Sequence, residues 1–475
     1  MADRGIELEI GRGEGTDTFT VQVLHSSGGR PRGRLDLDVS GILSRRTELE
    51  NALLASASKV RRAVAPDEDA LREIGQQLFE ALFAGPVSGA YRASLGAVTS
   101  AEGRLRVGLH ITAPELAALP WETMFDPVAG RYVCLDEPLV RRVDAPFAPE
   151  PLEVRPPVRI LGLVAAPNGL ANLDVRAEQA NLGRALADAE ARGLVQLTWA
   201  PDASWRTIHD LLLGHPWHVL HFIGHGAFDA RGGEGQLILV GPGGNPDYIE
   251  ASRLAELLSE ADPTPRLVVL NACAAGQSGT GDLFSGAAAA LVHGGVSAVA
   301  AMQFSISDQA AIAFARGFYT AIASGRPVDL AARSGRIDIR GIPTLEWVTP
   351  VLYARAGVQD IFRLGSSPAG DLAELSAMAQ AHMRAAHDEA AIDVMGRMLS
   401  QVPHDSRDEQ LLGWARRTLW LTQTYVRARR AEDSGAWSQA VAEYSRIVQS
   451  ESAYRDAQRR LSYCRDRALI VPQPR

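Results

Sequence analysis

A histidine and a cysteine follow two apolar stretches of the sequence and could act together as base and nucleophile. His225 comes just after the stretch 219–223, and Cys273 just after 267–270. The thiolate, not the thiol, is the nucleophile. A nearby histidine can take the thiol proton and return it to a leaving amine. We expect the backbone amides of Gly226 and Cys273 to lie past the strand ends without ladder partners, which makes them oxyanion-hole candidates.

Each of these residues also has an ordinary structural reading. A lone cysteine after a buried strand is usually a small core residue, and a lone histidine is usually satisfied by one hydrogen bond. Here the two are 48 residues apart, on consecutive strand-like stretches, and both have glycine nearby. A cysteine nucleophile about 50 residues after its histidine is a recognised arrangement. The combination favours catalysis by His225 and Cys273.

Metal and cofactor chemistry have weaker support. Five of the 11 histidines lie within 209–225, but His218 and His221 would point to opposite faces of one strand. No carboxylate separates His221 from His225, so no zinc site is predicted. Of 48 lysines and arginines only Lys59 is a lysine, which excludes a phosphate loop and leaves no well-placed Schiff base. No dinucleotide fingerprint or GxSxG motif occurs, and no cofactor is predicted.

The composition indicates a globular protein of several domains. The chain has 475 residues, 46% of them hydrophobic and 22% charged. Its net charge of −8 argues against nucleic-acid binding. Three dispersed cysteines cannot form a disulfide framework, and the N-terminus has no apolar signal core. The run 285–304 is mostly small residues and is a poor membrane span. These features predict a cytoplasmic protein without membrane contact.

The elements that must position His225 and Cys273 are apolar strands alternating with helices. Such a pattern predicts a parallel-dominated sheet covered on both faces, with the functional site past the carboxyl ends of the strands. The expected strands are 158–164, 194–198, 219–223, 267–270 and 296–300. The expected helices are 173–192, 204–214, 250–260, 281–294 and 306–322.

The flanking regions differ from this core. An α+β region is expected before it, with strands at 8–10, 19–23 and 35–39 followed by helices over 46–100. An α-helical tail is expected over 371–475, with weak copies at 387–390 and 437–440. Cys134 is expected in a strand-like segment and Cys464 in an amphipathic helix, both structural. The predicted domains are 1–150, 151–366 and 367–475.

Six ordered segments carry a resemblance to the CHAT family, caspase-like peptidases often fused to tetratricopeptide-type helices. The resemblance covers roughly residues 100–365. It implies a caspase–haemoglobinase fold and peptide hydrolysis by His225 as base and Cys273 as nucleophile. It also implies that the amides of Gly226 and Cys273 bind the oxyanion. The segments are 114–122, 221–226, 270–276, 291–296, 305–308 and 347–353.

Specificity is suggested by aspartates near the expected site. In the similar separases an aspartate after the strand beside the cysteine strand meets a substrate arginine, and Asp308 has that place here. Alternatively, Asp308 caps the helix that starts near Gln309. Asp282 has the same capping alternative and is a weaker pocket candidate. Asp229, just past His225, is the third.

The resemblance predicts a cysteine endopeptidase that cleaves specific protein targets, in bacterial defence or regulated cell death. Glycine-rich loops at 229–235 and 276–281 are expected to be ordered by substrate. We expect a regulatory protein or ligand to activate the enzyme by docking on the C-terminal helices. The alternative is a catalytically silent scaffold that assembles partners through those helices. A weaker third hypothesis is a flavodoxin-like ligand binder.

Overall fold

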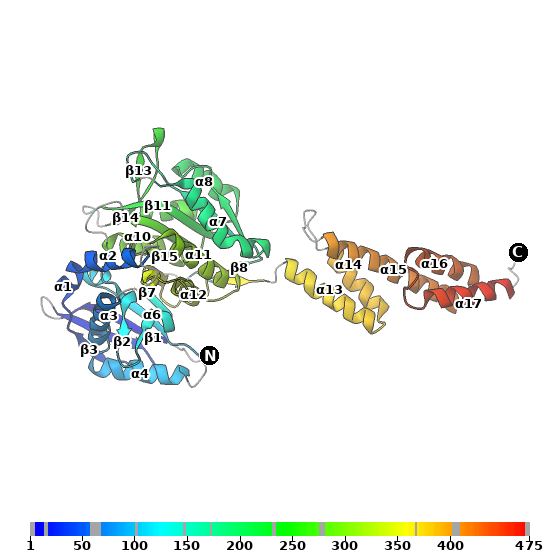
Figure 1. The fold of residues 1–475 in the computed structure, drawn as a ribbon, viewed down its shortest axis with the longest axis horizontal. Coiled ribbons are helices and arrows are strands. Elements are labelled where there is room, and N and C mark those ends of the chain that lie inside the picture. The colour runs from blue at the N-terminus through cyan, green and yellow to red at the C-terminus, as the bar shows by residue number, and fades with distance from the viewer. Residues whose placement is uncertain are drawn as a thin grey trace. The chain divides into compact units, whose positions relative to one another are not determined.

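The protein forms two compact units, residues 1–365 and 366–475. The computed structural model describes residues 5–13, 18–57, 68–99, 103–145, 149–171, 173–229, 234–274, 281–365, 368–400 and 409–470. Figure 1 shows sheet and helices in the first unit and helices alone in the second. The first unit contains both residues of the candidate dyad.

One sheet of 13 strands runs through the first unit, in the order β10-β9-β11-β14-β15-β16-β7-β4-β1-β2-β3, with β12 and β13 added beside β11. Its strands in the N-terminal half are β1 (Gly5–Arg12), β2 (Phe19–His25), β3 (Arg32–Leu35), β4 (Arg106–Ile111) and β7 (Leu139–Val143). The others are β9 (Val158–Val164), β10 (Val195–Trp199), β11 (Val219–Asp229), β12 (Glu234–Val240), β13 (Pro246–Glu250), β14 (Leu267–Ala274), β15 (Ala298–Met302) and β16 (Pro350–Arg355).

The sheet is parallel through its centre, as the alternation of strands and helices predicts. Strands β10, β9, β11, β14 and β15 run parallel to their neighbours. Strand β16 is antiparallel to β15 and begins a second parallel group with β7, β4 and β1. Hairpins β1–β2–β3 and β11–β12–β13 supply antiparallel edges. The predicted parallel-dominated α/β fold is confirmed.

Helices cover both faces of the central strands, because these strands are apolar at consecutive positions. Val269 belongs to the core that α7, α11 and α12 form on one face, whereas Val268 and Leu270 belong to the core with α8, α9 and α10. These helices are α7 (Val175–Ala191), α8 (Trp205–Gly214), α9 (Ala251–Ser259), α10 (Gly281–His293), α11 (Asp308–Ala323) and α12 (Val328–Arg340).

The N-terminal half packs its own helices on the same sheet. These are α1 (Val39–Ser44), α2 (Arg46–Ala57), α3 (Asp69–Leu82), α4 (Gly85–Thr99), α5 (Pro114–Ala117) and α6 (Val133–Asp136). Short 3-10 turns are η2 (Trp121–Thr123), η3 (Pro242–Gly244) and η4 (Glu346–Val348). Two small ribbons complete the unit: β5 (Phe125–Asp126) with β6 (Arg131–Tyr132), and β8 (Leu152–Val154) with β17 (Phe362–Leu364).

Two local predictions in this half are wrong. The expected strand 35–39 is not formed: β3 ends at Leu35, and Asp38 instead caps α1, accepting a 2.8 Å hydrogen bond from the amide of Gly41. The segment around Cys134 is helix α6 rather than a strand. Cys134 is nonetheless fully buried, as a structural cysteine should be.

The second unit consists of successive packed helices. They are α13 (Pro368–Arg384), α14 (Asp388–Ser400), α15 (Glu409–Asp433), α16 (Trp437–Ser450) and α17 (Ala457–Ile470). The weak copies at 387–390 and 437–440 fall at the starts of α14 and α16, each after a left-handed residue, Ala386 (φ 57°) and Gly435 (φ 74°). The predicted helical tail is confirmed. Its tetratricopeptide-like character and the domain boundary at 150 stay predictions.

None of the helices over the described ranges is both long enough and apolar enough to cross a membrane.

Candidate active site

His225 and Cys273 are register partners on the adjacent parallel strands β11 and β14. Both strands run past the ends expected from the sequence, so the two residues lie within strands and not beyond them. Neighbouring strands are about 4.8 Å apart, so the pairing brings the two backbones as close as a sheet allows. This proximity is fixed by the ladder and does not depend on a loop.

Strand alternation assigns both positions to one face of the sheet. His221, Ile223 and His225 share a face of β11, and positions 269, 271 and 273 share a face of β14, because side chains alternate with period two. Val269 packs in the core that includes helices α7 and α11. The candidate dyad therefore belongs to the face that α7 and α11 cover.

The hydrogen bond of His225 determines which ring nitrogen could act as the base. Its Nε2 lies 3.0 Å from the carbonyl oxygen of Ala171, and the side chain is only 4% exposed. A carbonyl can only accept, so in neutral His225 Nε2 carries the proton. Nδ1 is buried and has no partner among the described residues. It keeps its lone pair and can accept a proton.

The loop that carries Ala171 is itself anchored. It follows β9, and the amide of Ala165 donates to the carbonyl of Ile223 at 2.8 Å. Further along, the amide of Asn168 donates to the carbonyl of Gly244 at 2.7 Å. Gly244 has φ 80°, a conformation that favours glycine. Sequence reasoning found no third member for the dyad, because a backbone carbonyl leaves no residue-type signal.

Gly226 does not lie past the end of its strand, as the sequence-based reason for a free amide assumed. Strand β11 continues through Gly226, which is the register partner of Leu237 on β12 and of Ala274 on β14. The sequence did not predict strand β12, which pairs with β11 beside Gly226. The oxyanion role of the Gly226 and Cys273 amides remains a prediction from the family resemblance alone.

A narrow cleft lies along the same face, beside the strand positions that precede the dyad. Its volume is about 20 Å³, which is room for about one water molecule. Ile223 and Asn271, two residues before His225 and Cys273, both line it. Its polar lining is Glu178, Asn181, His221, Asn271 and Tyr319, and its apolar lining is Leu182, Ile223, Val269, Met302, Ala311, Ile312, Phe314 and Ala315.

The cleft has a neutral polar pair, His221 and Tyr319, on one side and an acidic residue, Glu178 of α7, on another. His221 Nδ1 and the Tyr319 hydroxyl are 2.8 Å apart, and burial lowers the pKa of His221 to about 3, which keeps the ring neutral. Burial raises the pKa of Glu178, and the charges of Asp308 and Asp174 raise it further. Sequence reasoning missed Glu178, which lies in no motif. It considered His221 only as a possible metal ligand and as part of the segment 221–226, and did not place it in a cleft.

The three aspartates proposed from the sequence have different outcomes. Asp308 is the exposed first residue of α11, and Ser307 rather than Asp308 caps that helix through a bond from the amide of Ala310. The capping alternative for Asp308 is therefore wrong. Asp282 lies in α10 and Asp229 ends β11, but their side chains lie outside the described residues. Most of the two glycine-rich loops also lies outside them.

The other two cysteines differ from a nucleophile in their surroundings. Cys134 and Cys464 are both buried and free. Burial raises the pKa of Cys134 to about 12 and also raises the pKa of Cys464. Both thiols are thus protonated and unreactive at neutral pH. Over the described ranges, no group of three or more His, Cys, Asp or Glu residues could hold a metal ion.

Comparison with known families now identifies the first unit. The sequence pattern of the CHAT domain matches residues 72–363, more than half of the chain. The chain belongs to the CHAT family. The match begins earlier than the resemblance in the sequence suggested, within α3, and ends in β17. It confirms the CHAT resemblance.

Two solved structures are similar to this CHAT protein at low identity. Both are separase–securin complexes from Saccharomyces cerevisiae. The complex at 3.0 Å resolution is 12% identical and the one at 2.6 Å is 11% identical, each with a TM-score of 0.41. The similarity covers 74% of this chain but only 30% of the matched chain. No curated protein matches the sequence.

Proposed function

We propose that this CHAT protein is a cysteine endopeptidase that uses His225 and Cys273 as a catalytic dyad. The observation that carries the proposal is the register pairing of the two residues on parallel strands. The tautomer of His225 supports it, because the nitrogen that is not bonded to Ala171 holds a lone pair. A cysteine and a base held on neighbouring strands need little rearrangement to react.

The chemistry proceeds by acyl transfer. His225 Nδ1 takes the proton of the Cys273 thiol, and the thiolate attacks the scissile carbonyl carbon. The imidazolium keeps its Nε2–H bond to Ala171, which stabilises the charge that forms on the ring. The tetrahedral oxyanion is stabilised by backbone amides, for which Gly226 and Cys273 are the candidates. His225 then protonates the leaving amine, and the C–N bond breaks.

Hydrolysis of the thioester returns the enzyme to its starting state. His225, neutral again after protonating the amine, accepts a proton from water as the water attacks the acyl carbon. The thiolate leaves, takes the proton back from the imidazolium, and the carboxylic acid product departs. No cofactor or metal enters this sequence. Each step uses only the dyad, the carbonyl of Ala171 and the oxyanion donors.

The lining of the cleft favours a substrate with a basic residue immediately before the scissile bond. Glu178 lines it, Asp308 and Asp174 act electrostatically on Glu178, and none of the three has an ion-pair partner among the described residues. A guanidinium would relieve this carboxylate repulsion through charge-assisted bonds. The apolar walls suit the aliphatic stem of arginine. Because the cleft is narrow, α7 must move away from α11 to admit it, as in induced fit.

A peptide library tests the proposed activity. The full chain is incubated with a mixture of random peptides, and cleavage products are sequenced by mass spectrometry. We expect cleavage after arginine in the wild type and none in Cys273→Ala. A matched control is Cys134→Ala, which removes a buried thiol from the same unit and should retain activity. Cleavage that persists unchanged in Cys273→Ala would contradict the proposal.

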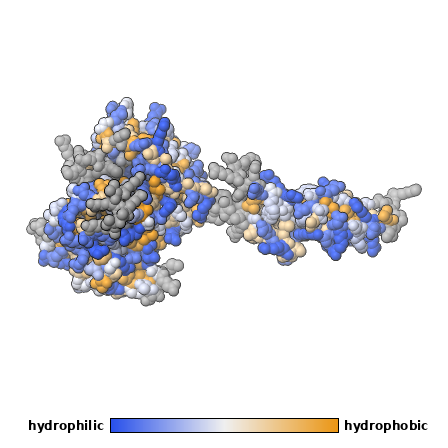
Figure 2. Space-filling model, viewed as in Figure 1, coloured by the Kyte–Doolittle hydropathy of each residue, from blue (hydrophilic) through white to orange (hydrophobic). Residues whose placement is uncertain are grey.

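Regulation would use the C-terminal unit. Helices α14, α15 and α17 line a groove of about 910 Å³, and the second unit has a largely hydrophilic surface in the view of Figure 2. Arg429, Arg430, Arg455 and Arg460 line the groove beside Asp388, Glu389 and Asp456. We propose that an activating partner in bacterial defence or regulated cell death docks there. Cleavage rates with and without the products of neighbouring genes test this step.

The scaffold alternative makes a different prediction in the same assay. A silent scaffold would bind such a partner equally well as the wild type or as Cys273→Ala, and would cleave nothing in either form. The proposed enzyme would bind the partner in both forms but cleave only with the cysteine present. Partner binding and peptide cleavage, measured on the same two proteins, therefore separate the two functions.

A further inference from the structure

One short segment determines where a wall of the cleft stands. Residues 303–307 connect β15 to α11. Met302, at the end of β15, lines the cleft, and so do Ala311 and Phe314 of α11. Asp308 directly follows the segment. Any shift of 303–307 would move the α11 wall and its acidic first residue relative to the dyad strands.

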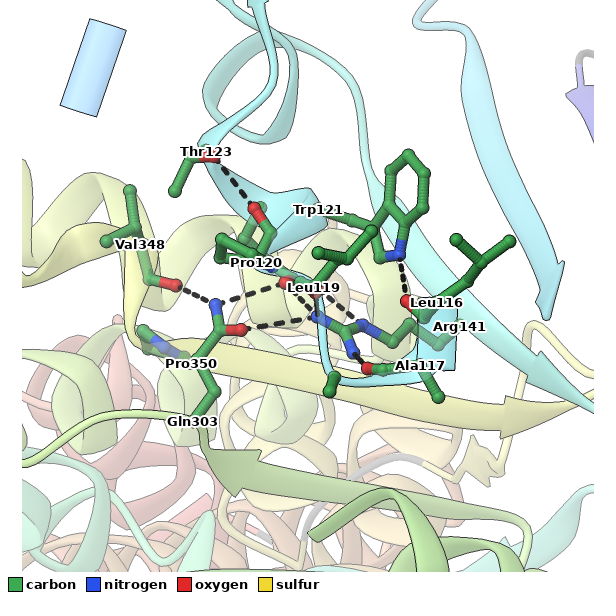
Figure 3. Close-up of polar contacts among 12 residues, drawn as sticks. Leu116, Ala117, Leu119, Pro120, Trp121, Thr123, Arg141, Gln303, Val348 and Pro350 are labelled. Atoms are coloured by element: carbon green, nitrogen blue, oxygen red, sulfur yellow. Dashed lines mark hydrogen bonds and ion pairs between the residues drawn. The ribbon is translucent and has the colours of Figure 1, made fainter. Parts of the chain in front are cut away.

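Gln303 begins the segment and is held by its backbone and its side chain. Its amide donates to the carbonyl of Thr349 at 3.0 Å, and its carbonyl accepts from Arg46 at 2.6 Å. Its side-chain amide donates to the carbonyl of Val348 at 2.7 Å and to the carboxylate of Glu122 at 3.1 Å. Figure 3 shows Gln303 between Val348 and the guanidinium of Arg141.

The side chain of Gln303 is attached to a buried ion pair, Glu122–Arg141. Nη2 of Arg141 lies 2.5 Å from Glu122, and the two side chains are 5% and 1% exposed. Arg141 also donates to the carbonyls of Ala117 at 2.7 Å and Leu119 at 3.1 Å, and to the side-chain oxygen of Gln303 at 3.3 Å. A buried ion pair is stable only when such additional bonds satisfy its remaining donors. In this network the nitrogens of Arg141 all donate, to Glu122, to Gln303 or to the carbonyls of Ala117 and Leu119.

Helix α2 contacts the next two residues of the segment, Phe304 and Ser305, directly. The guanidinium of Arg46 that bonds to Gln303 also lies 4.8 Å from the centre of the Phe304 ring. Glu50, one turn further along α2, accepts a 3.1 Å hydrogen bond from the Ser305 hydroxyl. Cation–π contacts of this kind are stronger when they are partly buried, because less water competes for the cation.

Helix α2 also supports the end of the segment through the turn η4. Ser56 accepts from the amide of Leu345 at 3.0 Å. The adjacent Glu346 is fully buried and accepts from the amide of Ser307 at 2.5 Å and from its hydroxyl at 2.8 Å. The cap of α11 is thus tied to η4, and η4 is tied to α2. Both ends of the segment depend on one helix of the N-terminal half.

We propose that α2 is the positioning element of the substrate cleft, with Arg46 and Glu50 as its positioning residues. They act through residues 303–305 and hold α11 and Asp308 as the fixed wall of the cleft. The proposal rests on the proposed function, since it takes the cleft as the substrate site. It predicts that α2 governs how well a side chain is bound and leaves the reactivity of the Cys273 thiol unchanged.

Two alkylating probes separate these effects in the full chain. Iodoacetamide reports the thiol alone, whereas a peptidyl-arginyl chloromethyl ketone must also fill the cleft. With each probe the thiolate displaces halide and forms a thioether. In Arg46→Ala/Glu50→Ala we expect the ketone rate to fall about tenfold, with iodoacetamide unchanged within twofold. Arg45→Ala/Glu48→Ala is the matched control, because Arg45 pairs with Glu48 and Glu73 and with no residue of 303–307.

The outcomes are distinct for the two proposals. A ketone rate that is unchanged or increased in Arg46→Ala/Glu50→Ala overturns the role of α2, as does an equal loss with both probes. A wild type that neither probe labels at Cys273 overturns the proposed function itself. Ser305→Ala gives a milder check that spares α2. It should slow alkylation by the ketone about threefold. Combining it with Glu50→Gln should slow the reaction no further, because both changes remove the same Ser305–Glu50 hydrogen bond.

Discussion

His225 and Cys273 are register partners on β11 and β14, and strand alternation puts both positions on the face covered by α7 and α11. The pairing comes from main-chain hydrogen bonds of a buried parallel sheet, which few side-chain changes can alter. It explains how two residues 48 positions apart in the sequence can lie side by side in the sheet. It also ties the dyad to the cleft, because the cleft is lined by the positions two residues earlier on each strand.

The acidic groups at the cleft should select arginine. Glu178→Gln removes the half-buried carboxylate whose pKa is raised by burial and by Asp308. We expect kcat/KM for an arginyl peptide to fall about tenfold to a hundredfold, since a charge-assisted bond is worth about 1.5–3 kcal/mol. Asp308→Asn should act in the same direction and less strongly, because Asp308 is exposed.

The control for this prediction is Asp188→Asn, an exposed carboxylate on the same helix α7 that does not line the cleft. It should leave the arginyl kcat/KM unchanged. Equal losses for arginyl and leucyl peptides in Glu178→Gln would indicate a general defect rather than selection of charge.

Gly224 should be intolerant of a side chain. A β-carbon there would lie 2.7 Å from the Phe222 ring and 3.2 Å from the β-carbon of Ala165. Gly224→Ala should therefore displace the strand beside His225, with a loss of about 1–3 kcal/mol in unfolding free energy and a marked loss of peptidase activity. Urea denaturation and peptide cleavage measure the two effects.

Gly183→Ala is the matched glycine change, because nothing lies within 4 Å of a β-carbon at that position of α7. It should stabilise the protein by about 0.5–1 kcal/mol through helix propensity. If Gly224→Ala also stabilises, the close packing at the dyad strand is not as described.

Acid should destabilise the protein through His221. The pKa of His221 is lowered by burial to about 3 in the folded state, against 6.5 in the unfolded chain. The unfolded state therefore binds the proton first, and stability present above pH 6.5 is lost as the pH falls toward 3. At pH 5 this loss is about 2 kcal/mol. The urea midpoint of unfolding should fall between pH 7.5 and pH 5 in the wild type. The fall should be smaller in His221→Gln.

Breaking the Glu122–Arg141 pair should destabilise the protein more than replacing both of its residues by apolar ones. Arg141→Met leaves a buried carboxylate without its cation, and we expect a loss of about 3–5 kcal/mol in unfolding free energy. Adding Glu122→Leu to Arg141→Met should restore part of that loss, because no buried charge then remains. A double variant less stable than the single one would contradict this account of the network.

The candidate dyad and the central strands could be predicted from the sequence, because apolar runs and glycine turns are local signals. The apolar stretches 219–223 and 267–270 contain no indication that their strands continue through His225 and Cys273. Ile223 of β11 pairs with Val164, the last residue of β9. From His225 onward β11 pairs instead with β12, and this pairing extends the strand. Such tertiary pairing has no periodicity of its own in the sequence.

The remaining parts of the candidate site depend on contacts that residue types do not encode. Ala171 contributes a backbone carbonyl, which any residue could supply. Glu178 lies on an amphipathic helix where an acidic residue is ordinary. Asp308 follows the true cap, Ser307, by one residue, and only the hydrogen bond to Ala310 separates the two roles. These assignments require the fold.

The pH dependence of Cys273 alkylation by iodoacetamide tests the dyad most directly. The rate is followed by peptide mass mapping in the wild type and in His225→Ala, with Cys134 and Cys464 as internal buried thiols. We predict that Cys273 reacts at neutral pH and that His225→Ala moves its apparent pKa upward by about one unit or more. An identical profile in both proteins would show that His225 and Cys273 do not work together.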